Sequence, residues 1–165
     1  MVTIDSKHYA QNPTDFPLPQ TILSIDVSAE NTGYVVARVD CDATEVLDCD
    51  TVPSYRALEA IGKYPITMVV VEKPAKGPYS DISTVVAYGV LVRDLCHTPY
   101  DIPHVIVLSP SQWKPFARGQ NWTNRYLRKY WRQLSTQHEC DAMSMVLYID
   151  VFKLRKGSPR WLNHE

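Results

Sequence analysis

The sequence contains no uninterrupted apolar segment near the roughly 20 residues that a membrane-spanning helix requires. Its first residues do not follow the order of a secretory signal peptide, in which basic residues precede an apolar stretch. The four cysteines, at positions 41, 49, 96 and 140, form no Cys-x-x-Cys pair, so free thiols are expected. These absences argue against a membrane or secreted protein. We expect a cytoplasmic protein, in the host cytoplasm if the source is viral, or one in an organellar stroma or matrix.

Length and composition indicate one globular domain preceded by an arm. A chain of 165 residues, 45% hydrophobic and 21% charged, can bury the core of one domain. Residues 1–20 are polar and contain Pro13, Pro17 and Pro19, which oppose regular structure. We therefore predict an extended or disordered arm over residues 1–20 and a single domain over residues 21–165.

The net charge of −1 conceals two segments of opposite charge. Residues 1–108 contain 7 basic and 14 acidic residues, whereas residues 109–165 contain 10 basic and 4 acidic residues. A run of charge is usually a solvated surface. Here aromatic residues are interleaved with the basic ones, which favours a polyanionic partner.

Asp26 lies in an unusual place for an acidic residue. The run Ile22-Leu-Ser-Ile-Asp26 is apolar and β-branched, and a second such run follows a short loop that ends at Gly33. This pattern predicts a β-hairpin with a carboxylate inside its first strand. Burying a carboxylate is costly unless a cation or hydrogen bonds compensate, so a functional role is expected for Asp26.

The rest of the pattern predicts alternating strands and helices. Strands are expected near residues 21–27, 33–39 and 45–51 as a meander, and then at residues 66–71 and 104–108. Helices are expected over residues 56–63, 80–97, 122–134 and 139–154, the third capped by Asn121 or Thr123, with a linker over residues 111–120. This order predicts an α/β fold whose mixed five-stranded sheet combines an antiparallel meander with parallel strands and carries helices on both faces.

Four residues of these elements could form one site. Asp26 lies in the first strand, Glu72 ends the fourth, and His138 and Asp141 share one face of the last helix if that helix begins early enough. Separately, each has an ordinary explanation, such as a strand end reaching solvent or a helix cap. Gathered together, carboxylates repel one another unless cations lie between them, which is the arrangement of two-metal phosphoryl chemistry.

Three segments resemble the RuvC-type Holliday-junction resolvases: Ile22-Leu-Ser-Ile-Asp26 with Asn31-Thr-Gly33, then Val69-Val-Val-Glu72, then His138-Glu-Cys-Asp141. The resemblance extends over roughly residues 21–152 and implies the ribonuclease H-like fold. Two positions differ from the family pattern. Val27-Ser28 replace a Pro-Gly pair, and Pro74-Ala75 replace an aromatic residue that pries open the junction, which leaves Tyr79 as the nearest aromatic.

By this resemblance, Asp26, Glu72, His138 and Asp141 bind two Mg²⁺ or Mn²⁺ ions and hydrolyse DNA phosphodiesters to 5′-phosphate and 3′-hydroxyl ends. The implied enzyme is a crossover junction endodeoxyribonuclease, which resolves four-way DNA junctions by paired symmetric nicks in recombination and repair. A homodimer would supply the two active sites that a two-fold symmetric junction needs. The apolar helix over residues 80–97 is its candidate interface, unless that face is buried within the monomer.

Basic residues complete the expected DNA surface. Lys114 lies where resolvases of this type carry a basic residue near the scissile phosphate, so it joins the candidate catalytic residues. Several cations fall on one stripe of the predicted helix over residues 122–134, although an ordinary amphipathic helix has the same pattern. The residues expected to bind DNA are Lys73, Lys76, Tyr79, Lys114, Arg118, Arg125, Arg128, Lys129 and Arg132.

Other functions stay open at this point. The same fold could act on flaps, other branched DNA or RNA–DNA hybrids, since a fold does not determine a substrate. A catalytically silent junction-binding module is a second alternative, which the missing Pro-Gly pair favours. Half of an actin-like ATPase also opens with an aspartate hairpin, but 165 residues and 6 glycines are too few for its tandem domains and phosphate loop.

Overall fold

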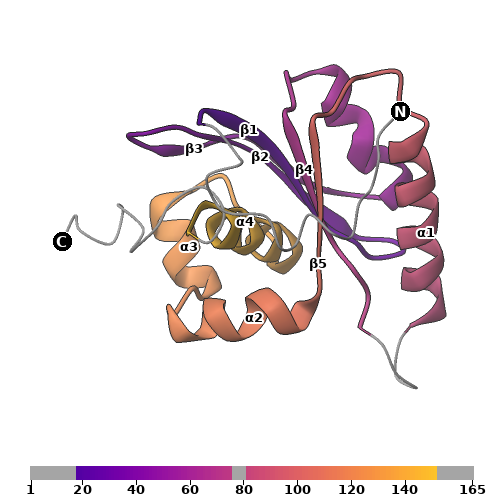
Figure 1. Cartoon of the computed structure of the whole chain (residues 1–165). Coiled ribbons are helices and arrows are strands. Elements are labelled where there is room, and N and C mark those ends of the chain that lie inside the picture. Colours follow the sequence, from indigo (N-terminus) through magenta and orange to yellow (C-terminus); the bar gives the residue numbers. More distant parts are fainter. Residues whose placement is uncertain (1–17, 76–80, 152–165) are drawn as a thin grey trace.

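Five strands form one mixed sheet in the order β3-β2-β1-β4-β5. The computed structural model describes residues 18–75 and 81–151 (Figure 1). The strands are β1 (Gln20–Asp26), β2 (Thr32–Val39), β3 (Thr44–Val52), β4 (Met68–Glu72) and β5 (His104–Leu108). β1, β2 and β3 are antiparallel neighbours, whereas β4 runs parallel to β1 and β5 parallel to β4. The predicted combination of a meander with parallel strands is confirmed.

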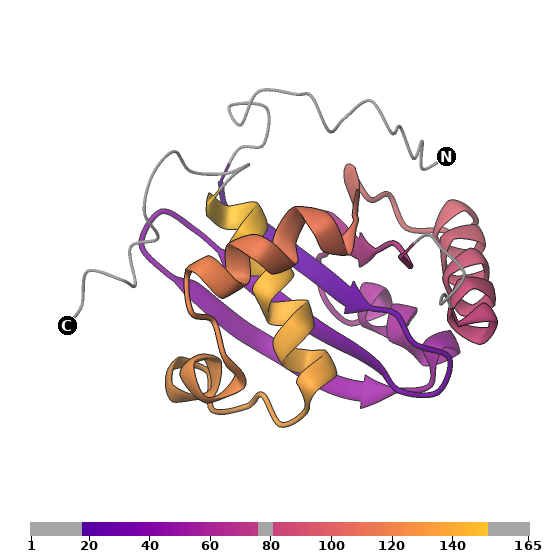
Figure 2. The same ribbon diagram turned by 90° about the horizontal axis from the view of Figure 1, so that it is seen from below.

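Helices cover both faces of this sheet, as the sequence predicts. They are η3 (Ser54–Gly62, a 3₁₀ helix), α1 (Ile82–Cys96), α2 (Pro110–Gly119), α3 (Asn124–Tyr130) and α4 (Gln137–Ile149). α2, α3 and α4 lie on one face, with α4 crossing the strands, and α1 lies on the other (Figures 1 and 2). None of the helices in the described ranges has both the length and the apolar character needed to cross a bilayer.

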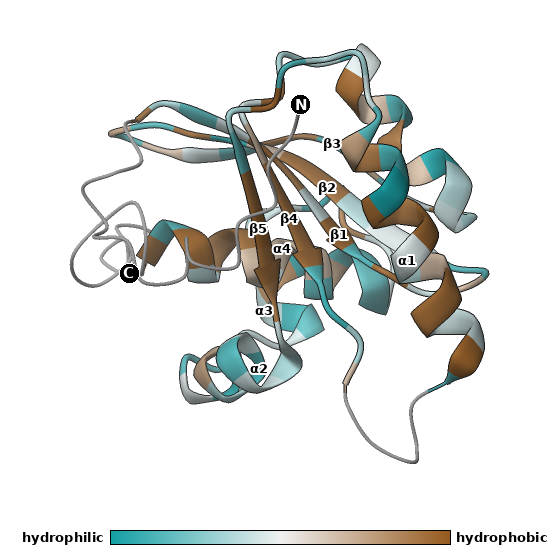
Figure 3. Ribbon diagram, turned by 45° about the vertical axis from the view of Figure 1, so that its right-hand side comes forward, coloured by the Kyte–Doolittle hydropathy of each residue, from teal (hydrophilic) through white to brown (hydrophobic). Residues whose placement is uncertain are grey.

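Alternate residues of the strands point into two separate cores. Ile22 and Val70 pack toward α4, while Leu23 and Val71 face the core that contains η3 and α1. The central strands are therefore buried on both faces, which explains their nearly continuous apolar sequences (Figure 3). The same alternation directs Asp26, four residues after Ile22, to the α4 face.

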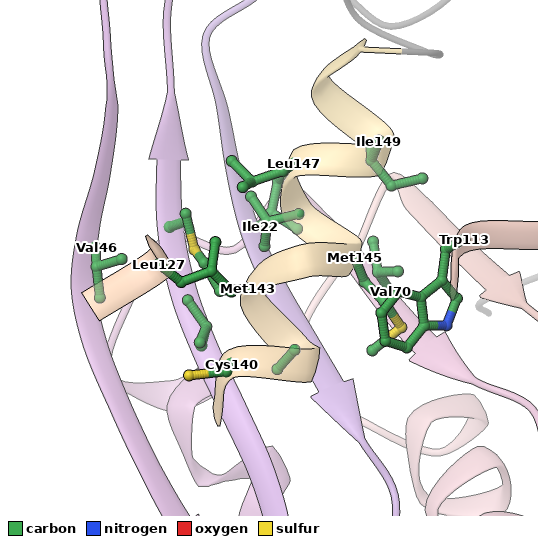
Figure 4. Close-up of a cluster of buried hydrophobic side chains, with 14 of the residues drawn as sticks. Ile22, Val46, Val70, Trp113, Leu127, Cys140, Met143, Met145, Leu147 and Ile149 are labelled. Carbon is green, nitrogen blue, oxygen red and sulfur yellow. The ribbon is translucent and has the colours of Figure 1, made fainter. Parts of the chain in front are cut away.

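The core under α4 holds that helix against the sheet. Met143, Met145 and Leu147 of α4 are fully buried in it, and Trp113 of α2 joins the same cluster (Figure 4). Inside this apolar contact, the Ser24 hydroxyl of β1 donates a hydrogen bond of 2.7 Å to the Ala142 carbonyl. This contact gives the helix a fixed position on β1.

The expected linker over residues 111–120 is wrong, because this segment forms α2. Ser109 and Gln112 make a capping box, and Pro110 occupies an early helical position, where its missing N–H costs nothing. Trp113 and Ala117 are buried against the core. Pro115 inside the helix and the low overall hydrophobicity of the segment conceal this helix in the sequence.

Smaller differences concern helix ends. The helix predicted over residues 122–134 ends at Tyr130, and its cap is Thr123, which accepts from the Tyr126 N–H. Asn121 is not the cap but has a φ of 57°, a left-handed conformation that asparagine tolerates. The last helix begins at Gln137, two residues earlier than predicted, and residues 152–154 lie outside the described residues, as do residues 1–17 of the expected arm.

Candidate active site

Asp26 and Glu72 lie side by side at the carboxyl ends of β1 and β4. The parallel register pairs Ile25 with Val71, and one further residue along each strand brings the two acids together on the α4 face. Their side chains are only 9% and 12% exposed. Two nearly buried carboxylates on adjacent strands form the base of the site.

The first turn of α4 brings His138 and Asp141 to these acids. The helix starts early enough to place both on one face, and His138 Nδ1 lies 2.8 Å from Asp26 Oδ2. Gly33, paired with Asp26 across the hairpin, makes this approach possible. A methyl group at position 33 would lie 2.3 Å from the carbonyl carbon of His138, well inside van der Waals contact.

α2 contributes two neighbours of Glu72. The Trp113 indole N–H donates to Glu72 Oε2 at 2.6 Å, and Lys114 Nζ lies 3.6 Å from Glu72 Oε1. Asp141 has a partner on its own helix, because Gln137 Nε2 donates to its Oδ1 at 2.7 Å. The structure thus gathers all five candidate catalytic residues predicted from the sequence, including Lys114.

Burial dominates the electrostatics of the three acids. Loss of solvent raises the pKa of Asp26 from 3.8 to about 6, against the lowering effect of its hydrogen bond with His138. Burial, followed by the charge of Asp26, raises the pKa of Glu72 from 4.5 to about 7, while Lys114 lowers it. Burial also raises the pKa of Asp141. Three carboxyl groups share a space in which full ionisation is unfavourable.

The donor set suits a hard divalent cation. Carboxylate oxygens are preferred ligands of Mg²⁺ and Mn²⁺, and a bound cation would offset both the burial and the smaller mutual repulsion that raise these pKa values. Over residues 18–75 and 81–151, however, no three His, Cys, Asp or Glu side chains form a ready-made ligand group. The direct contact between His138 and Asp26 would have to open, or be shared, for both to become ligands.

A cationic cleft of about 580 Å³ begins beside Asp141. It lies among α2, α3 and the start of α4, and its lining includes Lys114, Arg118, Arg125 and Asp141. Cations that line a cleft next to an acidic site attract an anion and place it beside the acids. This arrangement can hold a phosphate chain against the carboxylates.

The other predicted DNA-binding residues are more scattered. Lys73 lines a second hollow, of about 530 Å³, between the segments that follow β4 and β5. Arg128 Nη2 donates to the Ser135 carbonyl at 2.6 Å, and Lys129 Nζ lies 5.5 Å from the centre of the Tyr130 ring. Arg132 is exposed beyond the end of α3. Lys76 and Tyr79 lie outside the described residues.

Two residues of the site were missed in the sequence. Gln137 could have been found, because glutamine and aspartate four residues apart on a helix are a known stabilising pair. Trp113 was hidden by the expectation of a linker, although the Ser109 to Gln112 capping pattern signals a helix there. Its contact with Glu72 is non-local and has no signature in the sequence.

Comparison with known proteins supports the fold. No family model and no curated relative matches this sequence. Among solved structures, RuvC of Thermus thermophilus in complex with a Holliday junction substrate is 16% identical with a TM-score of 0.60, over 78% of this chain and 91% of that chain. A second Thermus thermophilus RuvC structure is 17% identical with a TM-score of 0.57, over 78% and 92%.

A third neighbour is the yeast mitochondrial Holliday junction resolvase Ydc2, which is 13% identical with a TM-score of 0.52, over 82% of this chain and 81% of that chain. At these identities the agreement concerns the backbone. It matches the sheet order and the helices on both faces described above. The chain therefore has the ribonuclease H-like fold of the RuvC-type resolvases, as its sequence resemblance implies.

Proposed function

We propose that this protein is a metal-dependent, structure-specific endonuclease that resolves four-way DNA junctions by paired symmetric nicks. One observation carries the proposal: Asp26, Glu72 and Asp141 meet His138 at the carboxyl edge of the parallel strands, directly beside a cleft lined with cations. Three acids at the end of a cationic cleft suit a substrate that is itself a polyanion. The fold shared with RuvC supports the choice of substrate.

Asp26, Glu72, His138 and Asp141 would hold two Mg²⁺ or Mn²⁺ ions. When bound, such ions activate water and stabilise charge on the leaving oxygen of a phosphodiester. The protein side chains orient the reaction. Trp113 donates a hydrogen bond that orients the Glu72 carboxylate, and Gln137 does the same for Asp141.

Lys114 would contact a non-bridging oxygen of the scissile phosphate. It lies between Glu72 and the cleft, is 37% exposed, and belongs to the lining of the cleft. An ammonium group at this position stabilises the negative charge that grows on the phosphorus oxygens during attack. Hydrolysis would leave a 5′-phosphate and a 3′-hydroxyl, the ends of a crossover junction endodeoxyribonuclease.

Arg118 and Arg125 would bind the phosphates that flank the cut, since both line the cleft. Lys129 and Arg132 are exposed on and just after α3 and would extend this contact. Arg128 would contribute less, because part of its guanidinium is bonded to Ser135. Lys73 would contact the DNA from the other side of Glu72. Lys76 and Tyr79 remain predicted DNA contacts, with Tyr79 the nearest aromatic residue to open the junction.

We also propose a homodimer that pairs two copies of α1. Ile82, Val85 and Val86 of this helix are 79%, 44% and 59% exposed, and Gly89 has open space above it. Exposed apolar side chains that follow one helix face favour burial against a partner. A second copy is the partner that fits, because two symmetric nicks need two active sites related by a two-fold axis.

The test is cleavage of synthetic DNA with Mg²⁺, Mn²⁺ or EDTA. A four-way junction, a flap and an RNA–DNA hybrid should be compared, with Asp26→Asn as the inactive control. We expect symmetric, ligatable nicks in the junction, none with EDTA, and much slower cleavage of the other substrates. Preferred cleavage of the flap or the hybrid would assign a different substrate to the same fold.

The contact of His138 with Asp26 favours one alternative, a junction-binding module without catalysis, because no ligand group is preformed in the described residues. Titration with Mn²⁺ separates the two. An active site binds Mn²⁺ and loses this binding in the Asp26→Asn variant. Tight junction binding without Mn²⁺ binding or cleavage would favour the silent module.

A further inference from the structure

Glu139 is a buried acidic residue that the proposed chemistry does not use. It lies between His138 and Asp141 in sequence, yet only 3% of its surface is exposed. Its carboxylate bonds to Thr51 of β3 rather than to any group of the acidic site. A carboxylate buried this deeply needs several hydrogen bonds to be tolerated.

Glu139 receives those hydrogen bonds from two segments. Thr51 Oγ1 donates to its Oε1 at 3.0 Å, and the Ser135 N–H donates to its Oε2 at 2.7 Å. The Ser135 hydroxyl lies 3.2 and 3.1 Å from the two oxygens. Thr136, the helix cap, accepts from the Glu139 N–H and lies 2.6 Å from Thr51 through the two hydroxyl oxygens.

The turn before α4 is also held from α3. Arg128 Nη2 donates to the carbonyl of Ser135, the residue whose N–H and hydroxyl bond to Glu139. Ser135 is therefore fixed through all of its polar groups. The first turn of α4 is thus linked by hydrogen bonds to both α3 and β3.

The position of this first turn of α4 matters because strand pairing links Thr51 to the acidic site. Thr51 pairs with Gly33 across β3 and β2, and Gly33 pairs with Asp26 across β2 and β1. Gly33 in turn lies directly against the backbone of His138. A shift of Glu139 relative to Thr51 would therefore also move His138 relative to Gly33 and Asp26.

We propose that Glu139 is a positioning residue, which anchors the first turn of α4 to β3 and so places His138 and Asp141 against Asp26. Its importance for catalysis rests on the proposed function, but its effect on geometry does not. Groups that orient the ligands of a metal site commonly change metal affinity or activity by about 10- to 100-fold when removed. We expect an effect of that size from Glu139.

The test compares Glu139→Ala with Glu139→Gln and Thr51→Val. Glutamine keeps one oxygen for the Ser135 N–H, while its amide can face the hydroxyl groups, which can turn to accept. Valine keeps the shape of Thr51 in the strand and removes its hydroxyl. Glu59→Ala is the matched control. Glu59 is an exposed acid that forms an ion pair with Arg56 within η3, and η3 lies on the sheet face opposite α4.

Three readouts separate positioning from folding, each at a temperature where circular dichroism shows a folded protein. They are Mn²⁺ affinity by calorimetry, the imidazole ¹⁵N shifts of His138 by NMR, and junction cleavage with its kcat and KM. In Glu139→Ala we expect Mn²⁺ affinity and kcat to fall about 10- to 100-fold with KM nearly unchanged. The His138 shifts should move toward those of Asp26→Asn, with Glu139→Gln closer to wild type.

The proposal would be overturned if Glu139→Ala folds, keeps the wild-type His138 chemical shifts, and has an Mn²⁺ affinity and a kcat within two-fold of wild type. If Glu139→Ala does not fold, Thr51→Val decides by the same readouts. If wild type cuts no junction, the proposed function fails, yet the His138 shifts and Mn²⁺ affinity still judge Glu139. If wild type also binds no Mn²⁺, the His138 chemical shifts alone test the positioning role of Glu139.

Discussion

Gly33 lies directly beneath the backbone of His138, so close that a methyl group on Gly33 would stand 2.3 Å from the His138 carbonyl carbon. The two residues are far apart in the sequence, since Gly33 belongs to the hairpin of β1 and β2 and His138 to the first turn of α4. Glycine is required here by the close approach of a helix backbone. The acidic site can close only because this position has no side chain.

Gly33→Ala should therefore damage the site more than an ordinary surface change. The methyl group must push α4 away from β2, and such overpacking typically costs about 1–3 kcal/mol of stability. We expect a lower melting temperature and at least a 10-fold loss of junction cleavage, as His138 separates from Asp26. Calorimetry and cleavage rates measure the two effects.

Gly119→Ala is the control, because a methyl group there meets nothing within 4 Å. It should leave melting temperature and cleavage close to wild type. If Gly33→Ala behaves like Gly119→Ala, the hairpin and α4 are further apart than the structure shows.

The raised pKa values predict that the metal-free protein loses stability as pH rises. Asp26 and Glu72 have folded-state pKa values of about 6 and about 7, above their ordinary values of 3.8 and 4.5. Between about pH 4 and pH 7 the folded state therefore binds more protons than the unfolded chain, so the free energy of unfolding falls as pH increases. Thermal melts in EDTA at pH 5 and pH 8 measure this dependence.

Asp26→Asn removes the Asp26 contribution to that loss. It should abolish cleavage yet stabilise the metal-free protein at pH 8, on the order of 1–3 kcal/mol, since one pKa unit corresponds to about 1.4 kcal/mol. Asp101→Asn controls for a general change of charge, because Asp101 is an exposed acid far from Asp26 in the sequence. Asp26→Asn melting below wild type at pH 8 would show that Asp26 is stabilising as an ion.

Lys114 and Arg125 should separate catalysis from binding. Lys114→Ala removes the cation next to Glu72, so kcat should fall by about 100-fold with little loss of junction affinity. Because Lys114 lowers the pKa of Glu72, its removal should also shift the acidic limb of the pH–rate profile to higher pH. Single-turnover cleavage across pH measures both changes.

Arg125→Ala should instead weaken binding. Loss of one phosphate contact reduces the slope of log affinity against log salt by about 1 and leaves the cleavage rate of bound junction unchanged. Lys63→Ala is the control for a lost positive charge, because Lys63 is an exposed cation at the end of η3. Equal effects of Lys114→Ala and Arg125→Ala on affinity and rate would contradict the division of roles.

The parts of the site that local patterns encode were predictable. Asp26 and Glu72 each end an apolar strand. Alternate residues of these strands face opposite sides of the sheet, so the sheet and its acidic edge follow from the sequence. His138 and Asp141 follow from their spacing once the helix start is known. The five-stranded α/β fold with helices on both faces is confirmed.

The parts of the site that depend on contacts between distant segments could not be predicted from the sequence. Trp113 bonds to Glu72 because α2 packs against α4 on the same face of the sheet, and α2 itself was hidden by Pro115. Glu139 reads as an ordinary helix-start acid until Thr51 is placed beside it. Such partners are determined by sheet order and helix docking, which periodicity does not report.

The last prediction concerns the exposed face of α1. Val86→Glu places a charge on a side chain that is 59% exposed, so it should leave the monomer folded and disrupt a dimer that buries this face. Leu47→Glu is the control, because Leu47 is a partly exposed apolar residue on the edge strand β3. Sedimentation should show dimers for wild type and Leu47→Glu and monomers for Val86→Glu.

The dimer should matter most for coupling the two nicks. On a plasmid with an extruded cruciform, a dimer cuts both strands in one encounter and yields linear DNA. Monomeric Val86→Glu should still hydrolyse the phosphodiester, because α1 lies on the sheet face opposite α4, so nicked circles should accumulate in place of linear product. Dimeric Val86→Glu with normal linear product would mean that the copies meet through another surface, and a monomeric wild type would remove the dimer altogether.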